Sequence, residues 1–350
     1  MLAPVTHILP LTTIRRERRL PIPGKVVARK GQKVSATDTV AEVVLSPSHL
    51  QLDVARGLGV TADEADQHIQ CKPDMQVAEG DILAGPVGLA RRVVRSPRSG
   101  RVVLVGSGQV LLEAQGKPYE LKAAVSGTVA SLIPDRGVIV ETTGALIQGV
   151  WGNGHIDSGL MNVLAREASH TLTADQLDVS YRGSVILAGH VAAAEVIKGA
   201  AELPLRGLIL SSMAPGLLPL ARKAQIPILL LEGFGFHPMN PVAFKLLSTN
   251  VQRDVVVNAE AWDIYAGTRP EVIIPLPSAG EVILPKDTDY FSPGQKVRVI
   301  RSPHFGEIGT LQEIREIAVF PSGVRAEAAE VRLENGNVAV LPLTNLDVLE

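Results

Sequence analysis

The stretch that decides the fold lies in the middle of the chain and contains four apolar runs: SVILA (184–188), GLIL (207–210), IPILLL (226–231) and DVVV (254–257). Runs of this kind, without alternating polar residues, are typical of strands that are buried on both faces. Helical patterns lie between them at residues 192–203, 217–223 and 241–249. Asn240-Pro241 supplies an N-cap and a proline at the first helical position of the last helix. Because strands alternate with helices, we expect βαβ units and a small parallel, Rossmann-like sheet.

The first 150 residues are dominated by short β-branched runs, each of which follows a turn. The turn-to-strand segments are PGKV (23–26), GQKV (31–34), EGDI (79–82), SGRV (99–102) and SGTV (126–129). Glycine tolerates the positive φ of such turns, and valine favours the extended chain that follows. Residues 52–69 interrupt this pattern with a helical one, in which Thr61 and Glu64 indicate a capping box. We therefore expect a β-rich domain at residues 1–150 with a helical insertion near residues 50–70.

The last part of the chain returns to β patterns after a central α/β domain that we place at residues 151–268. Arg269–Pro277 is interrupted by proline and is predicted as a linker or an edge strand. Further strands are predicted at residues 297–300, 310–314, 327–333 and 338–341. Asn335-Gly336 indicates a type I′ hairpin between the last two. Residues 151–182 mix glycine, polar residues and short apolar runs, and no fold is assigned to them.

The segment GQKVRVIRSPHFGEIGT at residues 294–310 resembles a KOW motif. In that family, a strand is followed by a polar turn with an aromatic residue and glycine, and a further glycine opens the next strand. Phe305, Gly306 and Gly309 stand at those places, and Arg301 and His304 complete the loop. The resemblance implies an SH3-like β-barrel within residues 269–350. KOW modules of elongation factors and ribosomal proteins contact RNA polymerase, RNA or ribosomal surfaces.

The N-terminal pattern resembles the barrel-sandwich hybrid fold of lipoyl and biotinyl domains. Residues 31–42 look like the first hairpin of that family, and residues 77–84 with 96–102 look like its second half. The modified lysine of the family is usually flanked by methionine, and no Met-Lys pair occurs in this sequence. We therefore expect the fold without attached biotin or lipoate. The three parts together resemble a bacterial family that combines such a domain, a small α/β domain and a KOW domain, in a multidomain α+β protein.

The composition excludes several classes of protein. Apolar residues make up 46% of the chain, which argues against global disorder, and aromatic residues only 3%, which argues against extensive base-stacking surfaces. Cys71 is the only cysteine, as in proteins of a reducing compartment. Met1–Arg19 places its apolar stretch before its charges, the reverse of a signal peptide, and no apolar run has the length of a membrane span. We expect a cytoplasmic, soluble protein without membrane insertion.

Sequence motifs for metals, cofactors and nucleophiles are missing. The chain has no His-Glu-x-x-His, Cys-x-x-Cys or calcium-loop pattern, so no metal site is expected. Gly149–Gly154 is followed by no P-loop lysine, and no G-x-G-x-x-G follows the strand that ends near Gly189. No G-x-S-x-G surrounds Ser211 and Ser212, and Cys71 has no cationic neighbour in sequence. We predict no cofactor and no catalytic residue.

A ligand site is most readily placed where the parallel strands end, because open α/β sheets bind ligands beyond the carboxyl ends of their strands. Polar and aromatic residues follow these strands, and Glu232 and His237 could exchange protons there. The alternative is structural: Phe234 and Phe236 fill a space between domains, and His237 caps a helix. The candidate ligand-binding residues are His190, Ser211, Ser212, Glu232, Phe234, His237 and Asn258.

The charge of the chain is unevenly distributed, although its formal net charge is only −2. Residues 1–45 hold eight basic and three acidic side chains, whereas residues 290–350 hold six basic and eight acidic ones. Since polyanion affinity scales with the number of phosphates neutralised, the N-terminal region is the predicted nucleic-acid surface and the KOW region is expected to face protein. The alternative is that these arginines are merely solvated. The candidates are Arg15, Arg16, Arg18, Arg19, Arg91, Arg92, Arg95, Arg98 and Arg101.

These observations favour a noncatalytic binding or adaptor protein with a protein or RNA partner, associated with the transcription or translation machinery. The alternative is a small-ligand-binding protein or an enzyme, with a concave pocket that contains His190, Glu232 and His237. A third possibility is a structural subunit of an envelope-associated assembly. That role rests on the barrel-sandwich resemblance, and the sequence shows neither the membrane anchor nor the long helical hairpin of such adaptors.

Overall fold

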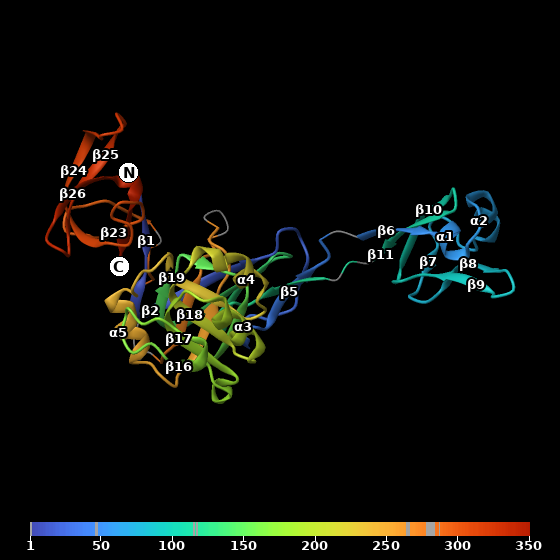
Figure 1. Ribbon diagram of the computed structural model, residues 1–350, viewed down its shortest axis with the longest axis horizontal. Helices are drawn as coiled ribbons and strands as arrows, with labels where there is room; N and C mark the ends of the chain where they lie inside the picture. The colour runs from blue at the N-terminus through green and yellow to red at the C-terminus, as the bar shows by residue number, and fades with distance from the viewer. Residues whose placement is uncertain are drawn as a thin grey trace.

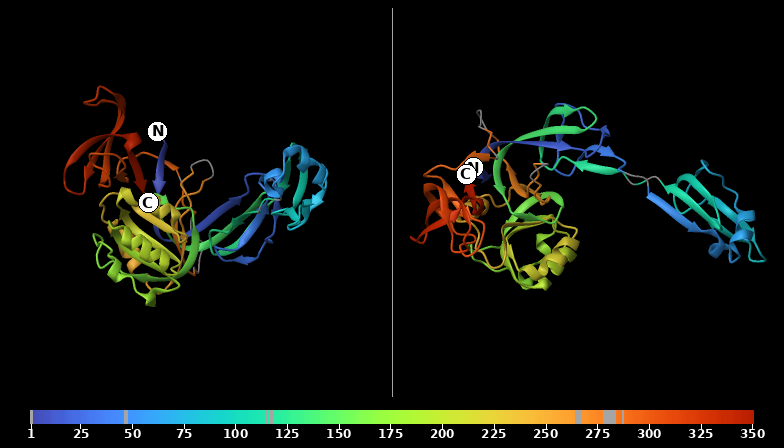
Figure 2. Two further views of the ribbon diagram at one scale, coloured as in Figure 1. Left: turned by 45° about the vertical axis from the view of Figure 1, so that its right-hand side comes forward. Right: turned by 90° about the horizontal axis from the view of Figure 1, so that it is seen from above.

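The chain forms a β-rich α+β protein in which about 49% of the residues are in strands and 14% in helices. The computed structural model describes residues 2–45, 48–114, 116, 118–263, 267–277, 284–286 and 288–350. Three parts can be followed in Figure 1: a central body, a lobe on one side of it and a C-terminal module on the other. Figure 2 shows the lobe extending away from the other two parts, and both chain termini beside the C-terminal module.

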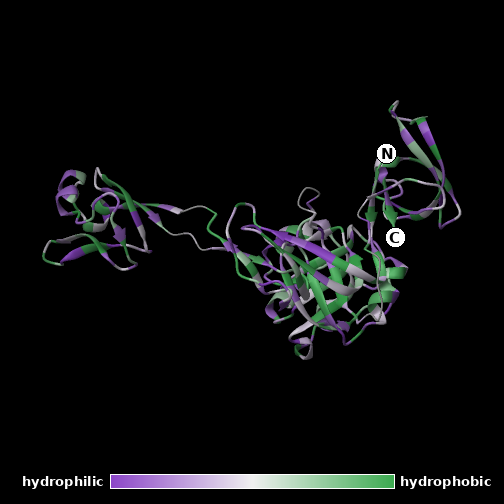
Figure 3. Ribbon diagram, turned by 180° about the vertical axis from the view of Figure 1, so that it is seen from behind, coloured by the Kyte–Doolittle hydropathy of each residue, from purple (hydrophilic) through white to green (hydrophobic). Residues whose placement is uncertain are grey.

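The central body is built on an eleven-stranded mixed sheet. Its parallel part consists of four neighbouring strands: β16 (Ile156–Val163), β17 (Ser184–Val191), β18 (Gly207–Met213) and β19 (Ile228–Phe234). Every residue of β17 and β18 is buried, as the unbroken apolar runs predicted. The hydropathy colouring of Figure 3 likewise concentrates hydrophobic residues in the strands of this body. The predicted alternation of strands and helices is confirmed here.

Three helices connect and cover the parallel strands: α3 (Ala194–Glu202), α4 (Leu218–Lys223) and α5 (Pro241–Ser248). α5 shares a buried cluster with Val185 and Leu187, whereas α3 and α4 share another with Ile186 and Ala188. Because neighbouring residues of a strand point to opposite faces, β17 is covered on both sides. Asn240 caps α5 as predicted, since its side chain accepts hydrogen bonds from two backbone N–H groups of the first turn.

The rest of the central sheet is antiparallel and joins segments that are far apart in sequence. It consists of β20 (Asp254–Asn258), β21 (Glu271–Pro275), β14 (Gly137–Gln148), β13 (Gly127–Ile133), β4 (Lys33–Val34) and β2 (Ile8–Arg19), together with the edge strand β15 (Trp151–Gly152) beside β19. β20 was predicted as part of the parallel sheet but runs antiparallel to β16 and β21. The sheet also crosses the boundary predicted at residue 150, because β14 pairs with both β13 and β21.

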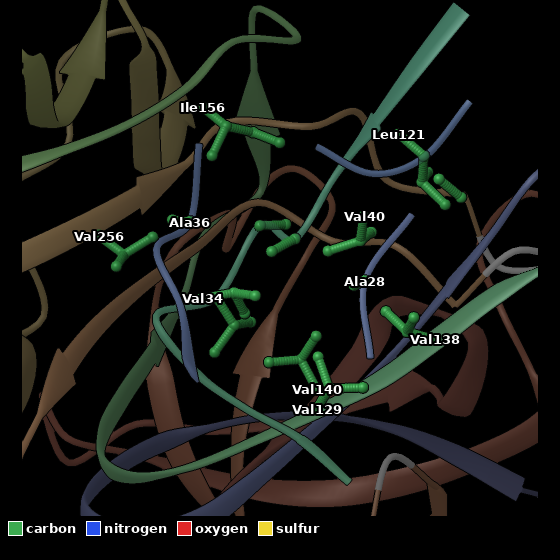
Figure 4. Packing of buried hydrophobic residues seen from close by; sticks show 14 of the residues in the cluster. Ala28, Val34, Ala36, Val40, Leu121, Val129, Val138, Val140, Ile156 and Val256 are labelled. Carbon is green, nitrogen blue, oxygen red and sulfur yellow. The ribbon is translucent and has the colours of Figure 1, made fainter. Parts of the chain in front are cut away.

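The N-terminal β region packs around one apolar cluster, shown in Figure 4. Strands β3 (Lys25–Val26), β5 (Thr39–Val43) and β12 (Tyr119–Lys122) form a small sheet that contributes to it. Ile156 and Val256 of the central sheet reach into the same cluster. Residues 31–42 therefore pack with residues 121–140, and residues 77–102 pack in a different cluster. The two halves that resemble a barrel-sandwich hybrid in sequence do not lie together.

Residues 48–114 form the lobe, which has its own hydrophobic cluster around Val54, Leu83 and Leu112. Its strands are β6 (Ser48–Asp53), β7 (Gln76–Val77), β8 (Ile82–Val87), β9 (Arg92–Arg95), β10 (Gly100–Gly106) and β11 (Gln109–Ala114). Four of them form a sheet in the order β6-β11-β10-β7, and β8 pairs with β9. Among the described residues, no strand of the lobe pairs with a strand outside it. The lobe thus has a core that is independent of the central body.

The helix predicted at residues 52–69 is two short helices, α1 (Val54–Leu58) and α2 (Ala62–His68). Gly59 ends α1 in the left-handed conformation, with φ of 75°, and this conformation cannot continue a helix. Thr61 then caps α2, because its side chain accepts a hydrogen bond from the backbone N–H of Glu64, as the sequence predicted. The prediction of one continuous helix was wrong because it gave no weight to Gly59.

The C-terminal module is a seven-stranded sheet with a separate apolar cluster. In sheet order its strands are β22 (Thr288–Tyr290), β1 (Leu2–Thr6), β27 (Leu346–Leu349), β23 (Lys296–Val299), β24 (Ile308–Val319), β25 (Arg325–Leu333) and β26 (Val338–Pro342). The four predicted C-terminal strands are present. β1 was not predicted: it pairs parallel with β27 and antiparallel with β22. The module therefore takes strands from both ends of the chain.

Asn335-Gly336 forms the predicted hairpin between β25 and β26, but with a different turn. A type I′ turn needs positive φ at both central residues, and Gly336 has φ of 88° whereas Asn335 is not among the described residues with positive φ. The backbone N–H of Gly336 donates to the carbonyl of Leu333. This is the pattern of a type I turn followed by a left-handed glycine, so the hairpin is confirmed and its predicted turn type was wrong.

Candidate functional site

The residues predicted at the strand ends come together only in part. His190 at the end of β17, Ser212 in β18 and the segment after β19 form one hydrogen-bonded cluster. Nδ1 of His190 lies 2.9 Å from the Ser212 hydroxyl oxygen. That oxygen also lies 3.0 Å from the backbone nitrogen and 2.9 Å from the carbonyl oxygen of His237. The cluster ties the loop after β19 to the two preceding strands through the backbone of His237.

The His190–Ser212 pair does not have the surroundings of a nucleophile and its base. Ser211 and Ser212 are fully buried. The Ser212 hydroxyl already contacts His190 and both backbone groups of His237, and it lies 3.5 Å from the Ser211 hydroxyl, so the directions in which it can donate and accept are occupied. Burial, assisted by the nearby imidazole of His237, lowers the pKa of His190 below its usual value. We interpret this pair as a neutral structural contact.

The remaining aromatic and acidic candidates point to different partners. Phe236 meets the ring of His190 edge to face, with the ring centroids 5.2 Å apart. Phe234 packs in the same manner against Trp151 at 5.6 Å. Glu232 instead faces the C-terminal module and the start of α5, where its carboxylate accepts a hydrogen bond of 2.9 Å from the backbone N–H of Asn240. His190 and Glu232 therefore do not converge on one pocket.

The loop that resembles a KOW motif is an internal contact of the molecule. Phe305 packs on the ring of His237, with centroids 4.8 Å apart. A Cβ atom at Gly306 would lie 3.4 Å from Nδ1 of the same imidazole, so the loop approaches His237 closely. The two sites that the sequence predicted separately, the strand ends and this loop, thus meet at the junction of the central body and the C-terminal module.

The other loop residues have local roles. His304 lies 3.0 Å from the carboxylate of Glu307, and Arg301 is exposed, with a hydrogen bond to the carbonyl of Ile300. Gly309 lies in β24, where a Cβ atom would come within 2.6 Å of the carbonyl oxygen of Arg332. Glycine is needed there because the opposing backbone leaves no room for a side chain.

A buried ionic cluster at the same junction was not predicted. Nη1 of Arg298 lies 3.3 Å from Oε2 of Glu232, and Nη2 lies 2.9 Å from Oδ2 of Asp347. The Thr6 hydroxyl donates to the same Asp347 oxygen and accepts from Arg269, which also donates to the carbonyl of Val5. Arg298 and Arg269 thus balance the charges of Glu232 and Asp347. The cluster lies where β1, β19, β23 and β27 meet. Burial makes this arrangement costly to break.

Asn258, the remaining strand-end candidate, lies in a different place. It borders a hollow of about 910 Å³ on the central body, which we call the arginine hollow. Its lining residues are Arg15, Arg16, Glu17, Arg18, Arg19, Leu20, Pro21, Tyr119, Leu121, Ala124, Arg136, Asn258, Glu260, Gly267, Thr268, Arg269 and Glu271. The structure therefore brings Asn258 beside four of the arginines that the sequence predicted as a nucleic-acid surface.

The predicted nucleic-acid arginines do not form one surface. Arg15, Arg16, Arg18 and Arg19 lie on β2 of the central body, and the others lie on the lobe. Several are engaged in ion pairs: Arg16 with Glu271, Arg18 with Glu260, Arg19 with Glu17, and Arg101 with Asp74 and Glu113. An arginine that is paired with a carboxylate offers less net charge to a phosphate. The single N-terminal surface expected from the sequence is thus divided and partly neutralised.

The four remaining lobe arginines are exposed: Arg91, Arg92, Arg95 and Arg98. The side chains of Arg92 and Arg95 donate hydrogen bonds to the backbone carbonyl oxygens of Leu58 and Gly80, at 3.5 and 2.8 Å. Within the described part of the chain, none of the four has a carboxylate partner. Their positive charge is therefore available to an anionic partner.

The sequence did not reveal the ion-pair partners that neutralise these arginines and carboxylates. Glu260 and Glu271 lie more than 240 residues from the arginines that they bind, and Arg298 lies 66 residues from Glu232. No local pattern reports such pairings. The only available signal was a carboxylate or an arginine inside an otherwise apolar strand, as at Glu271 before VII and at Arg298 between two valines.

Other features give no further chemical site. Burial raises the pKa of the Cys71 thiol, which agrees with the passive role predicted for it. Among the residues that the structure describes, no group of three or more His, Cys, Asp or Glu side chains is arranged to hold a metal ion. No helix in the described ranges has the length and apolar character needed to span a bilayer. No protein-family model matches the sequence, and neither does any curated protein.

Proposed function

We propose that this protein is a noncatalytic adaptor that binds RNA through the arginines of its lobe. The observation that carries the proposal is the set of four exposed lobe arginines without a carboxylate partner, Arg91, Arg92, Arg95 and Arg98. Guanidinium groups bind phosphate in a bidentate manner, and their charge stays unneutralised here. Three of the four belong to or adjoin the short β8–β9 pair, so one antiparallel pair of strands carries them, with Arg92 and Arg95 on opposite faces of β9.

We expect the lobe to recognise the phosphate backbone of RNA. The lobe contains no tryptophan, phenylalanine or tyrosine in residues 48–114, so it has no aromatic platform for stacking bases. Contacts of arginine with phosphate fix a polyanion in place but carry no sequence information. We therefore expect affinity for RNA that depends strongly on salt and weakly on base sequence.

The adaptor role follows from the remainder of the molecule. We interpret the C-terminal module as an SH3-like KOW barrel and the region around β3, β5, β12 and β13 as related to a barrel-sandwich hybrid. The buried Arg298 cluster supports a fixed orientation of that module on the central body, and the acidic balance of residues 290–350 favours a protein partner there. The buried, fully hydrogen-bonded Ser212 argues against an enzyme at the strand ends.

The test is fluorescence anisotropy of a labelled single-stranded RNA at a series of salt concentrations. Two double variants, Arg91→Ala/Arg92→Ala and Arg95→Ala/Arg98→Ala, are each expected to lower the slope of log K against log salt by about 1.4, since each phosphate contact contributes about 0.7. The matched control is Arg166→Ala/Arg253→Ala, which removes two exposed arginines of the central body. Binding that is absent at low salt, or that falls equally in the control, overturns the proposal.

A further inference from the structure

We infer that the arginine hollow of the central body binds a small phosphorylated anion of the nucleoside phosphate class. The hollow is lined by six arginines and three glutamates, so its formal charge is positive. Its volume of about 910 Å³ is at the upper end of the range typical of ligand sites, roughly 300–1,000 Å³. It lies on a different part of the molecule from the lobe, and the inference does not depend on RNA binding.

The glutamates of the hollow are already satisfied by three of its arginines. Arg16 binds both carboxylate oxygens of the buried Glu271, at 2.6 to 3.1 Å. Arg18 binds both oxygens of Glu260, at 2.6 and 2.8 Å, and its Nε donates to the carbonyl of Lys122. Glu17 pairs with Arg19 at the surface. These pairs fix the walls of the hollow. Arg269, which also lines it, faces Asp347 at 3.9 Å, so among the described lining residues no carboxylate is left to pair with Arg15 or Arg136.

Two further arginines supply the charge for an anion. Arg15 is exposed, and its guanidinium has no partner within the described residues. Arg136 is half-buried and donates only to the backbone carbonyls of Leu20 and Pro21, at 3.4 and 2.9 Å. A guanidinium that is bonded to neutral carbonyls keeps its full charge. Phosphate is the natural ligand for such groups, because its oxygens accept two parallel hydrogen bonds from one guanidinium.

The hollow also offers groups that suit a nucleoside. Asn258 is buried at its wall, and its side-chain oxygen accepts a hydrogen bond of 3.1 Å from the backbone N–H of Glu260. The amide nitrogen of Asn258 makes no hydrogen bond in the described part of the chain and can donate to a ligand. Tyr119 lines the hollow with 42% of its surface exposed and presents an aromatic ring to a planar group.

Isothermal titration of the full chain with inorganic pyrophosphate, ATP and adenosine tests the inference. Pyrophosphate and ATP are expected to bind, ATP more tightly, and adenosine alone is not. Arg15→Ala and Arg136→Ala should each weaken ATP binding about tenfold, because a hydrogen bond to a charged group contributes about 1.5–3 kcal/mol. Tyr119→Ala should weaken ATP binding and leave pyrophosphate binding unchanged. Arg253→Ala, on the same body but outside the hollow, is the control.

The outcomes separate the parts of the inference. Absence of pyrophosphate and ATP binding, or binding that survives both arginine replacements in protein with unchanged circular dichroism, overturns it. ATP that binds no more tightly than pyrophosphate overturns the nucleoside assignment. The lobe variant Arg91→Ala/Arg92→Ala should leave ATP affinity unchanged, so that failure of the RNA proposal and failure of this one are told apart.

Discussion

Replacement of Arg298 by methionine is expected to loosen the junction between the central body and the C-terminal module. Methionine keeps the apolar stem of the side chain but removes the guanidinium that binds Glu232 and Asp347. Both carboxylates are buried, with 8% and 4% of their side-chain surface exposed. After the change, two negative charges remain inside the protein without the cation between them. Neither carboxylate can recover the lost interaction from water without opening the junction.

The size of the effect follows from what each carboxylate retains. Glu232 keeps the backbone N–H of Asn240, whereas Asp347 keeps the Thr6 hydroxyl and Arg269 at 3.9 Å. Oδ1 of Asp347 already has no hydrogen-bond partner among the described residues. Removal of one partner from a buried ion pair costs about 3–5 kcal/mol. Because the partial partners remain, we expect a loss near the lower end, about 3 kcal/mol.

Guanidinium chloride unfolding of wild type and variant measures this loss. Far-ultraviolet circular dichroism follows all three parts, and tryptophan fluorescence follows the central body, which holds both Trp151 and Trp262. The matched control is Arg315→Met, which removes an exposed pair with Glu330 and should cost no more than about 1 kcal/mol. A double-mutant cycle with Glu232→Gln should give a coupling energy of about 0.5–3 kcal/mol, since the two side chains are in contact.

Equal losses for Arg298→Met and Arg315→Met would refute the reasoning, because they would show that burial adds nothing to the ionic cluster. A coupling energy of zero between Glu232 and Arg298 would refute the direct pairing. Increased proteolysis between the central body and the module, seen for Arg298→Met and not for Arg315→Met, would place the loss at the junction.

Two further predictions follow from shifted pKa values. Because the pKa of His190 is lowered in the folded protein, an unfolded His190 takes up a proton near pH 6.5 while the folded one stays neutral. The stability that neutral His190 contributes is therefore complete above about pH 6.5 and is lost as the pH falls below it. Urea unfolding at several pH values should show the advantage of wild type over His190→Gln shrinking on acidification, and an advantage that grows would contradict this sign. Cys71 is buried and the pKa of its thiol is raised, so its thiolate is scarce and shielded in the folded protein. We expect a thiol reagent to react slowly with the native protein and fast with the protein in urea. Equal rates would show that the thiol is accessible in the native protein.

Much of the local structure could be read from the sequence because it depends on neighbouring residues. The apolar runs at residues 184–188 and 207–210 became buried strands, and Asn240-Pro241 started a helix where predicted. Thr61 also became an N-cap. Errors arose where a single residue changed the local outcome, as when left-handed Gly59 divided one predicted helix into two.

The candidate sites were predicted less well, because charge and accessibility depend on partners that are distant in sequence. His190 and Ser212 were correctly placed near each other by their strand ends, since parallel neighbours end at the same edge of a sheet. The strand pattern did not show whether the imidazole and the hydroxyl are free to bind a ligand. The C-terminal loop around Phe305 packs on that region, and Glu232 is engaged by Arg298.

The sequence by itself determined many of the strands and helices, among them β17, β18 and α5, because hydrophobic periodicity, caps and turns act over a few residues. The tertiary structure alone decided that β1 joins the C-terminal module, that residues 48–114 have a core of their own, and that Arg15 and Arg136 keep free charge while Arg16 and Arg18 do not. Strand pairing and ion pairing join residues more than a hundred positions apart, and their free energy depends on burial that no local pattern records.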